Sequence, residues 1–405
     1  MALPLLHILK GLQQPRSRIL MEAVAADAND GQAATNVTSD RAPEAPEDTV
    51  GRIGRFPQIR VGVTVQVDRH NPNTRGSGGP AKTSGIIRVG LAALWLVTSV
   101  TVRSAALQAQ SAPQSVRAST GWAYEIANRV ITPRGALVLM PGFGGDFAEF
   151  SEAGKSVSHR SVLADSLASR GITLVFIAPP NGVLFGGASH MQQLEDTIKE
   201  ALETVSTGAL RLAIGGFSAG GTDAILFAER CAEGRCAMPH TVRAVFAVDA
   251  PLDWYRLWDN AMVVLRNQPP GANVSEARRI QGALEERLGK QPTPSSRRYL
   301  LSSPLASKDR DGGNAQKLSG MAVRAYTEPD IQWWMENRSA DYYGMNALDA
   351  ASLIRHLKLL GNTRAELLVT TGRGYRADGS RHPHSWSIVD QVDLAQWLAL
   401  QLAPR

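Results

Sequence analysis

The stretch Leu-Arg-Leu-Ala-Ile-Gly-Gly-Phe-Ser-Ala-Gly-Gly-Thr-Asp-Ala-Ile-Leu-Phe-Ala-Glu, residues 210–229, decides the fold of this chain. An apolar run of strand length, residues 210–214, leads into Gly216-Phe217-Ser218-Ala219-Gly220, and helix-forming residues without proline follow. Glycines on both sides of Ser218 let a strand and a helix approach closely at a sharp turn from which the serine hydroxyl projects. The pattern therefore predicts a strand, a turn that carries a serine nucleophile, and a helix.

Apolar runs of strand length alternate with helical patterns across residues 119–405. We expect strands at 124–131, 135–140, 173–178, 242–248, 323–327 and 366–371, and helices at 161–169, 191–205, 347–360 and 388–402. This alternation is typical of an α/β protein whose mostly parallel sheet carries helices on both faces. Between about residues 253 and 318 the alternation stops, and a charged helical segment lies among loops rich in Pro, Ser and Gly. We interpret this insertion as a helical cap over a substrate pocket.

The charge of the chain is concentrated at its N-terminal end. Residues 1–118 contribute +5 of the formal net charge of +6, so the remainder is almost neutral. No basic face is implied, and we therefore expect no nucleic-acid partner. Residues 1–84 are rich in Pro, Gly, Asn, Thr and Arg without a sustained helical or strand period, and we expect them to be disordered.

Residues 85–118 have the pattern of a signal peptide followed by a linker. Lys82 and Arg88 precede an uncharged apolar run, residues 89–102, which is too short to span a bilayer comfortably, and alanines and a polar segment follow. We therefore expect export, to the periplasm or the medium, through a signal near residues 82–112. Because a signal should open a chain, the residues upstream are then an extension outside the native protein. The alternative is an uncleaved anchor with a cytoplasmic tail.

Cys231 and Cys236 are the two cysteines of the chain, and they close a short loop just after the expected serine helix. Their spacing suits a disulfide and does not suit a four-ligand zinc site. A bridge requires an oxidising compartment, so we predict it on the condition of export. The alternative is a pair of buried thiols.

Acyl transfer through a serine needs donors for the oxyanion, a base for the hydroxyl proton, and a carboxylate that orients the base. A glycine-rich turn, Met140-Pro141-Gly142-Phe143-Gly144-Gly145, follows an expected strand upstream of the serine. Such a turn leaves backbone N–H groups free, so we expect the amides of Phe143 and Ala219 to form the oxyanion hole.

Of the eight histidines, His382 and His384 stand out because they follow the last expected strand and precede the last expected helix. His384 lies directly at the entrance of that helix, whereas a proline separates His382 from it. We therefore expect His384 to be the base, in hydrogen-bond contact with Ser218.

The order of serine, acid and histidine, together with the glycine-rich turn and the serine turn, resembles the α/β-hydrolase superfamily over roughly residues 120–403. More narrowly, two segments look like those of a group of exported bacterial hydrolases: Thr327-Glu328-Pro329-Asp330-Ile331-Gln332-Trp333-Trp334 and His382-Pro383-His384-Ser385-Trp386-Ser387. One departure is Pro141, where lipase-like members often have histidine, and this weakens a lipase assignment.

The resemblance implies that the acid of the triad follows the penultimate strand, which points to Asp330. Spacing agrees, because one crossover helix separates this position from the final strand, as a parallel sheet needs. Asp249 ends an earlier strand, where some members of the superfamily carry the acid, and Asp253 and Glu328 are further candidates. We expect a carboxylate oxygen of Asp330 to lie within hydrogen-bond distance of a ring nitrogen of His384.

These residues imply a serine hydrolase that cleaves an ester or related acyl bond of a small molecule through an acyl-enzyme, with no metal or organic cofactor and no stable membrane insertion of the mature domain. The alternatives are an acyltransferase that uses the same residues and a catalytically silent binding member of the fold. Five aromatic residues are candidates for an apolar pocket: Trp254, Tyr255, Trp258, Trp333 and Trp334.

Overall fold

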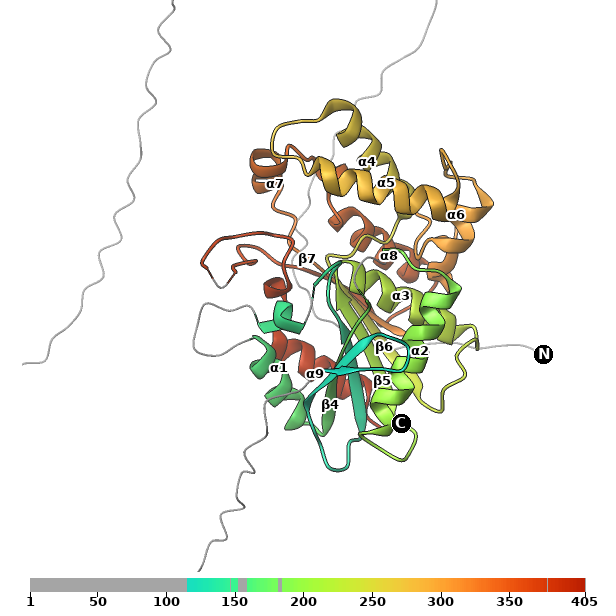
Figure 1. Ribbon diagram of the computed structural model, residues 1–405, viewed down its shortest axis with the longest axis vertical. Coiled ribbons are helices and arrows are strands. Elements are labelled where there is room, and N and C mark those ends of the chain that lie inside the picture. Colours follow the sequence, from blue (N-terminus) through green and yellow to red (C-terminus); the bar gives the residue numbers. More distant parts are fainter. Residues whose placement is uncertain (1–114, 146, 152–158, 181–183, 377, 405) are drawn as a thin grey trace, which may run out of the picture. The chain divides into compact units, whose positions relative to one another are not determined.

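The computed structural model describes residues 115–404, except 146, 152–158, 181–183 and 377 (Figure 1). The predictions of a disordered extension and a signal peptide fall almost entirely on residues 1–114 and so lie outside the described residues. Within the described part of the chain, no helix combines the length and the apolar character needed to cross a membrane.

In the described residues the strands form one eight-stranded sheet with the order β1-β2-β4-β3-β5-β6-β7-β8. Strand β2 runs antiparallel to both of its neighbours, and the pairs from β4 to β8 are all parallel. The predicted mostly parallel α/β sheet is therefore confirmed. The strands are β1 (Val116–Arg117), β2 (Ala123–Asn128), β3 (Gly135–Met140), β4 (Ile172–Ala178), β5 (Arg211–Phe217), β6 (Thr241–Val248), β7 (Ala322–Thr327) and β8 (Ala365–Val369).

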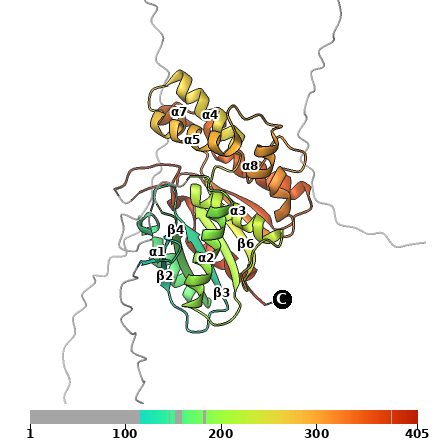
Figure 2. The ribbon, with the colours of Figure 1, turned by 45° about the vertical axis from the view of Figure 1, so that its right-hand side comes forward.

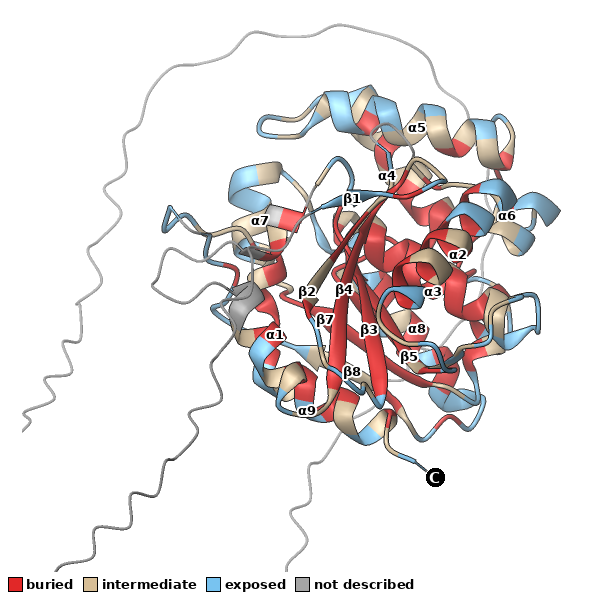
Figure 3. Ribbon diagram, turned by 60° about the horizontal axis from the view of Figure 1, so that its bottom comes forward, coloured by how far each residue is buried: buried red, intermediate tan, exposed pale blue. Residues whose placement is uncertain are grey.

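Helices cover both faces of the sheet (Figures 1 and 2). Helices α1 (His159–Ala168) and α9 (Gln391–Gln401) pack on one face, and α2 (Ala188–Glu203), α3 (Ala219–Ala232) and α8 (Ala347–Leu359) pack on the other. Every residue of β3 and β4 is buried, as expected for strands covered on both sides (Figure 3).

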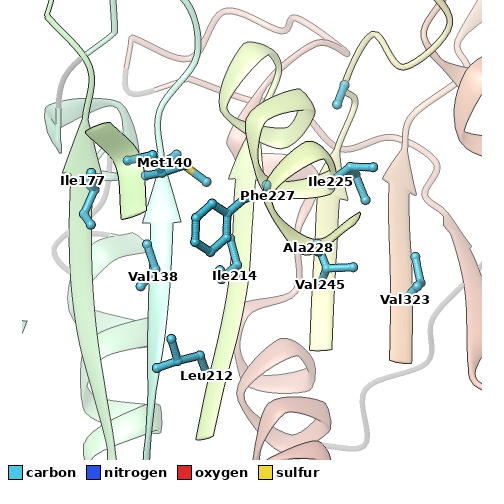
Figure 4. Close-up of a cluster of buried hydrophobic side chains, with 14 of the residues drawn as sticks. Val138, Met140, Ile177, Leu212, Ile214, Ile225, Phe227, Ala228, Val245 and Val323 are labelled. Carbon is cyan, nitrogen blue, oxygen red and sulfur yellow. The ribbon is translucent and has the colours of Figure 1, made fainter. Parts of the chain in front are cut away.

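Alternate residues of each central strand supply the two apolar cores. In β3, Val138 and Met140 face α2 and α3, whereas Leu137 and Leu139 face α1 and α9. Figure 4 shows the first of these cores, with Phe227 of α3 over the sheet. This double burial fixes the register of the central strands and thereby the positions of their carboxyl ends.

The segment between β6 and β7 is helical and forms a group of its own above the carboxyl ends of the strands (Figure 1). A small apolar core that includes Trp254, Leu284 and Tyr299 holds this group together. Its elements are α4 (Trp254–Asn267), α5 (Val274–Leu288) and α6 (Arg297–Ser302). The 3₁₀ helix η2 (Gly313–Leu318) ends the segment and packs on the core under α3 and α8 through Ala315 and Leu318. The remaining short elements are η1 (Phe147–Ser151), α7 (Ile331–Arg338), η3 (Tyr342–Gly344) and η4 (Trp386–Ile388).

Cys231 and Cys236 form a disulfide at the end of α3. Of the two alternatives left by the sequence, the structure therefore has the bridge.

Candidate active site

Ser218 lies at the turn between β5 and α3, in a backbone conformation that few side chains adopt. Its φ is 52° and its ψ is −121°, and its N–H donates to the carbonyl of Val248 at 2.9 Å. A Cβ on Gly216 would lie 2.2 Å from the backbone carbon of Gly220, and a Cβ on Gly220 would lie 2.3 Å from the carbonyl oxygen of Pro141. Glycine is therefore required at both positions for the strand, the turn and the helix to pack. The predicted strand, serine turn and helix are all present.

His384 connects this serine to a buried carboxylate. Its Nε2 lies 3.0 Å from Ser218 Oγ, and its Nδ1 lies 2.6 Å from Oδ2 of Asp249. The imidazole ring packs 4.7 Å from the ring of Phe217, which limits its orientations. The predicted contact of His384 with Ser218 is present, and both nitrogens of the ring have the partners that a general base of this type needs.

Asp249 occupies the position just past β6, and the sheet fixes it there. Its φ is 44°, its N–H donates to the carbonyl of Tyr326 at 2.8 Å, and its Oδ1 accepts from Thr327 Oγ1 at 3.3 Å. The side-chain amide of Asn346 donates to the Asp249 carbonyl at 2.8 Å. Only 5% of the surface of Asp249 is exposed, so its carboxylate contacts His384 in a position that is almost inaccessible to solvent.

The carboxylate changes the basicity of the histidine. Burial of the ring opposes its protonation, but the hydrogen bond and the negative charge of Asp249 outweigh burial and raise the pKa of His384 above its ordinary value of 6.5. A base of raised pKa takes a proton from a hydroxyl more readily, provided that the pH keeps the ring neutral.

The expectation that Asp330 pairs with His384 is wrong. Asp330 is the N-cap of α7: its Oδ1 accepts from the N–H of Trp333 at 3.0 Å, and its Oδ2 pairs with the guanidinium of Arg381. The N–H of Trp333 and the charge of Arg381 together hold the pKa of Asp330 below its ordinary value. The carboxylate is thus fully engaged at the start of a helix, and the acid beside His384 is Asp249.

The other acids considered from the sequence also have structural partners. Glu328 accepts from Arg381 Nη2 at 2.8 Å, and Asp253 caps α4 and accepts from the hydroxyl of Tyr299 at 2.8 Å. Arg381 therefore ties the loop that carries His384 to the carboxyl end of β7. Sequence reasoning missed this anchoring role.

The glycine-rich turn lies against Ser218. A Cβ on Gly142 would be 3.3 Å from Ser218 Cβ, and the turn is closed by a hydrogen bond from Gly145 N to the Gly142 carbonyl at 3.0 Å. Ala219 is the first residue of α3, where backbone N–H groups have no partner within the helix. Phe143 and Ala219 both line the cavity that contains Ser218.

The cavity has a volume of about 340 Å³ and lies between the serine turn and the helical insertion. Ser218, Ala219 and His384 line it from the sheet side, and α4 and α5 line it mainly with Leu257, Ala261, Val264, Ala277 and Ile280. Of the five aromatic residues proposed from the sequence, Trp334 lines the cavity, whereas Trp254 is fully buried in the core of the insertion.

Metal ligands are not grouped in this region. In the ranges that the structure describes, no three His, Cys, Asp or Glu side chains are placed so as to hold a metal ion.

Comparison with known proteins gives remote similarities to solved structures. No protein-family model matches the chain, and no curated protein matches it. Among solved structures, the chain is similar to a monoglyceride lipase of Saccharomyces cerevisiae, with 14% identity, 73% of this chain and 98% of that chain covered, and a TM-score of 0.43. It is also similar to carboxyl esterase 2 of Tuber melanosporum, with 14% identity, 73% and 88% covered, and a TM-score of 0.41. Similarities this remote leave the activity to be argued from the site.

The topology itself identifies the architecture that the sequence resemblance implied. The sheet order, the antiparallel β2 and the helices on both faces are all in place. Because the serine turn follows β5, the carboxylate follows β6 and the histidine follows β8 of such a sheet, the chain has the α/β-hydrolase fold.

Proposed function

We propose that this protein is a serine esterase that hydrolyses a small-molecule ester through an acyl-enzyme. The observation that carries the proposal is the chain of hydrogen bonds from Ser218 through His384 to Asp249, with distances of 3.0 and 2.6 Å, at the wall of a cavity large enough for a substrate.

In the proposed mechanism, Ser218 Oγ attacks the ester carbonyl carbon while His384 Nε2 takes the hydroxyl proton. The carbonyl oxygen becomes an oxyanion, which the N–H groups of Phe143 and Ala219 stabilise. The intermediate collapses, and the alcohol leaves with the proton from His384. Water then attacks the acyl carbon and gives a proton to His384, and the acid is released as Ser218 regains its hydrogen.

A fluorophosphonate probe tests the nucleophile directly. We expect the probe to label the wild-type protein and not Ser218→Ala, and we expect that variant to lose 4-nitrophenyl ester hydrolysis by a factor on the order of 10⁶. Ser319→Ala is the matched control, because Ser319 is exposed and lies outside the cavity. Labelling that persists in Ser218→Ala would place the nucleophile elsewhere.

Two alternatives predict different products. An acyltransferase would pass the acyl group from Ser218 to an alcohol or amine, so product analysis with competing acceptors separates it from an esterase. A catalytically silent binding member would fold and bind esters without labelling or turnover.

A further inference from the structure

His382 lies beside the proposed catalytic histidine in the wall of the same cavity. Its ring centroid is 6.3 Å from that of His384, and it packs 4.4 Å from the ring of Trp333 and 5.8 Å from that of Trp334. Nδ1 of His382 accepts a hydrogen bond from the backbone N–H of His384 at 3.1 Å. An accepting ring nitrogen carries no proton, so the proton of the neutral ring is on Nε2.

The environment keeps this ring neutral. Burial disfavours the charged form, and the nearby His384, Arg376 and Arg338 add to the effect, so that the pKa of His382 is lowered to about 3. At any ordinary pH, therefore, His382 presents an uncharged Nε2–H donor.

A second donor faces the first. Nη2 of Arg338 lies 3.4 Å from Nε2 of His382. Two N–H groups cannot hydrogen-bond each other, because each needs an acceptor. Arg338 Nη1 donates to the Asn337 carbonyl at 3.0 Å and the guanidinium lies over the ring of Trp333, but within the described residues no acidic side chain pairs with Arg338. Both donors are partly exposed and line the cavity that contains Ser218, so an acceptor group of a ligand that enters the cavity can bind both of them in place of water.

We propose that Arg338 and His382 form a carboxylate-binding subsite and that the substrate is an ester with a carboxylate a few atoms from the scissile carbonyl. This inference rests on the proposed esterase function and names its substrate class. Two donors, one of them a guanidinium, match the two oxygens of a carboxylate. Phosphate is a poorer match, because its sites typically add backbone N–H groups from a nest or a helix N-terminus. The wall formed by α4 and α5 is mainly apolar, apart from Asn260, Glu276 and Arg279, and its apolar part suits the hydrocarbon remainder of such an ester.

Matched substrate pairs test the inference. One pair is mono-4-nitrophenyl adipate and its carboxamide, with the charge on the acyl side, and the other is 3-acetoxybenzoate and 3-acetoxybenzamide, with the charge on the alcohol side. After subtraction of the spontaneous rate, we expect kcat/KM to favour the carboxylate in at least one pair by about 10- to 100-fold, as for a hydrogen bond to a charged group. Equal kcat/KM within both pairs would overturn the proposal.

The variants locate the preference. Arg338→Gln is expected to lower the ratio of kcat/KM for carboxylate over carboxamide to near one, and Arg338→Lys to retain part of it. His382→Leu should lower the same ratio. If this substitution also disturbs His384, the rates of both substrates fall by the same factor, so the ratio of kcat/KM measured on one variant is not affected. A parallel fall for both substrates, with the ratio intact, would show a structural role and overturn the proposal.

Two matched controls remove the same charge elsewhere. Arg376 acts electrostatically on His382 but does not line the cavity, so Arg376→Gln should leave the ratio unchanged. Arg279 lines the cavity from α5 and lies over Phe143. If Arg376→Gln or Arg279→Gln loses the preference for the carboxylate substrate as fully as Arg338→Gln does, the preference comes from the general electrostatic field or from another cation. That result would overturn the proposed subsite. Absence of both fluorophosphonate labelling and ester hydrolysis would instead overturn the esterase function and this inference with it.

Discussion

The carboxylate beside His384 decides how well the histidine works, because a neutral imidazole needs an acceptor at Nδ1 to present Nε2 to the serine. Asp249→Asn keeps the shape of the side chain but favours the wrong tautomer, and we expect kcat to fall by as much as about 10⁴. Asp330→Asn should retain nearly normal kcat, since asparagine also caps a helix and Arg381 keeps Glu328 as a partner. Steady-state kinetics on the two purified variants checks this. The reverse pattern would return the catalytic acid to β7.

The raised pKa of His384 predicts the acid limb of the pH profile. Hydrolysis requires the neutral ring, so kcat/KM should fall as the pH drops through a pKa above 6.5. Without the charge of Asp249, burial becomes the main influence on the pKa of His384, and burial lowers that pKa. The acid limb of the residual activity in Asp249→Asn should therefore move to lower pH. A pH series of kcat/KM for both proteins measures the shift, and an unmoved limb would mean that another group controls it.

The sequence allowed the serine and the histidine to be predicted but not the acid. Ser218 belongs to a local pattern of strand, turn and helix, in which the glycines that permit the turn are neighbours in the chain. The choice of acid depends on a contact between Asp249 and His384, which are 135 residues apart. Asp249 and Asp330 both follow parallel strands, and their local sequences do not say which one faces the histidine.

At the scale of elements, α7 explains that error. None of its residues is buried, so it has no apolar stripe by which a helix is recognised in a sequence, and Asp330 is therefore not identified from the sequence as a helix cap. The helices that pack on the sheet were predicted because burial imposes such stripes, as in α2 with Leu194, Ile198 and Leu202.

The loop from Asp249 to the start of α4 is held by a buried ion pair between two elements. Asp349 of α8 accepts from the N–H groups of Leu252 and Asp253 at 2.8 and 3.0 Å and from Nε of Arg256 at 2.5 Å. Its exposed fraction is 1%. Asn346, at the start of α8, joins the same network by donating to the Asp249 carbonyl and accepting from Arg256 Nη2 at 3.3 Å.

Arg256→Met should therefore destabilise the fold by about 3–5 kcal/mol, because it leaves the Asp349 carboxylate buried without its cation. Arg373→Met is the matched control: Arg373 pairs with Asp390, their side chains are 43% and 52% exposed, and the loss of this pair should cost at most about 1 kcal/mol. Urea denaturation of both variants gives the two free energies of unfolding. Equal losses of unfolding free energy in the two variants would mean that the buried ion pair contributes no more to stability than the exposed pair.

For the molecule as a whole, the disulfide offers a test that does not involve the active site. Cys231 and Cys236 close a short loop, and a bridge of this length stabilises a fold by about 2 kcal/mol through the unfolded chain. We expect the double variant (Cys231→Ser with Cys236→Ser) and the reduced wild type to unfold at the same urea concentration. This concentration should be lower than the one at which the oxidised protein unfolds. Identical midpoints with and without reductant would show that the bridge does not stabilise the fold.

We propose export of this protein, which the bridge supports, because structural disulfides persist mainly in oxidising compartments. N-terminal sequencing of the exported protein should find a mature chain that begins after the alanines of the signal-like segment near residues 82–112. A mature chain that begins near Met1 would contradict the proposal.

The anchoring of the histidine loop has a consequence for how the loop tolerates substitutions. Strands β6 and β7 are neighbours, and the loop is joined to both: the ring of His384 to Asp249, and Arg381 to Asp330 and Glu328. Because the two connections come from different strands, a variant that loses the carboxylate at one strand keeps the connection to the other. The loop should therefore stay near the cavity in Asp249→Asn as well as in Asp330→Asn.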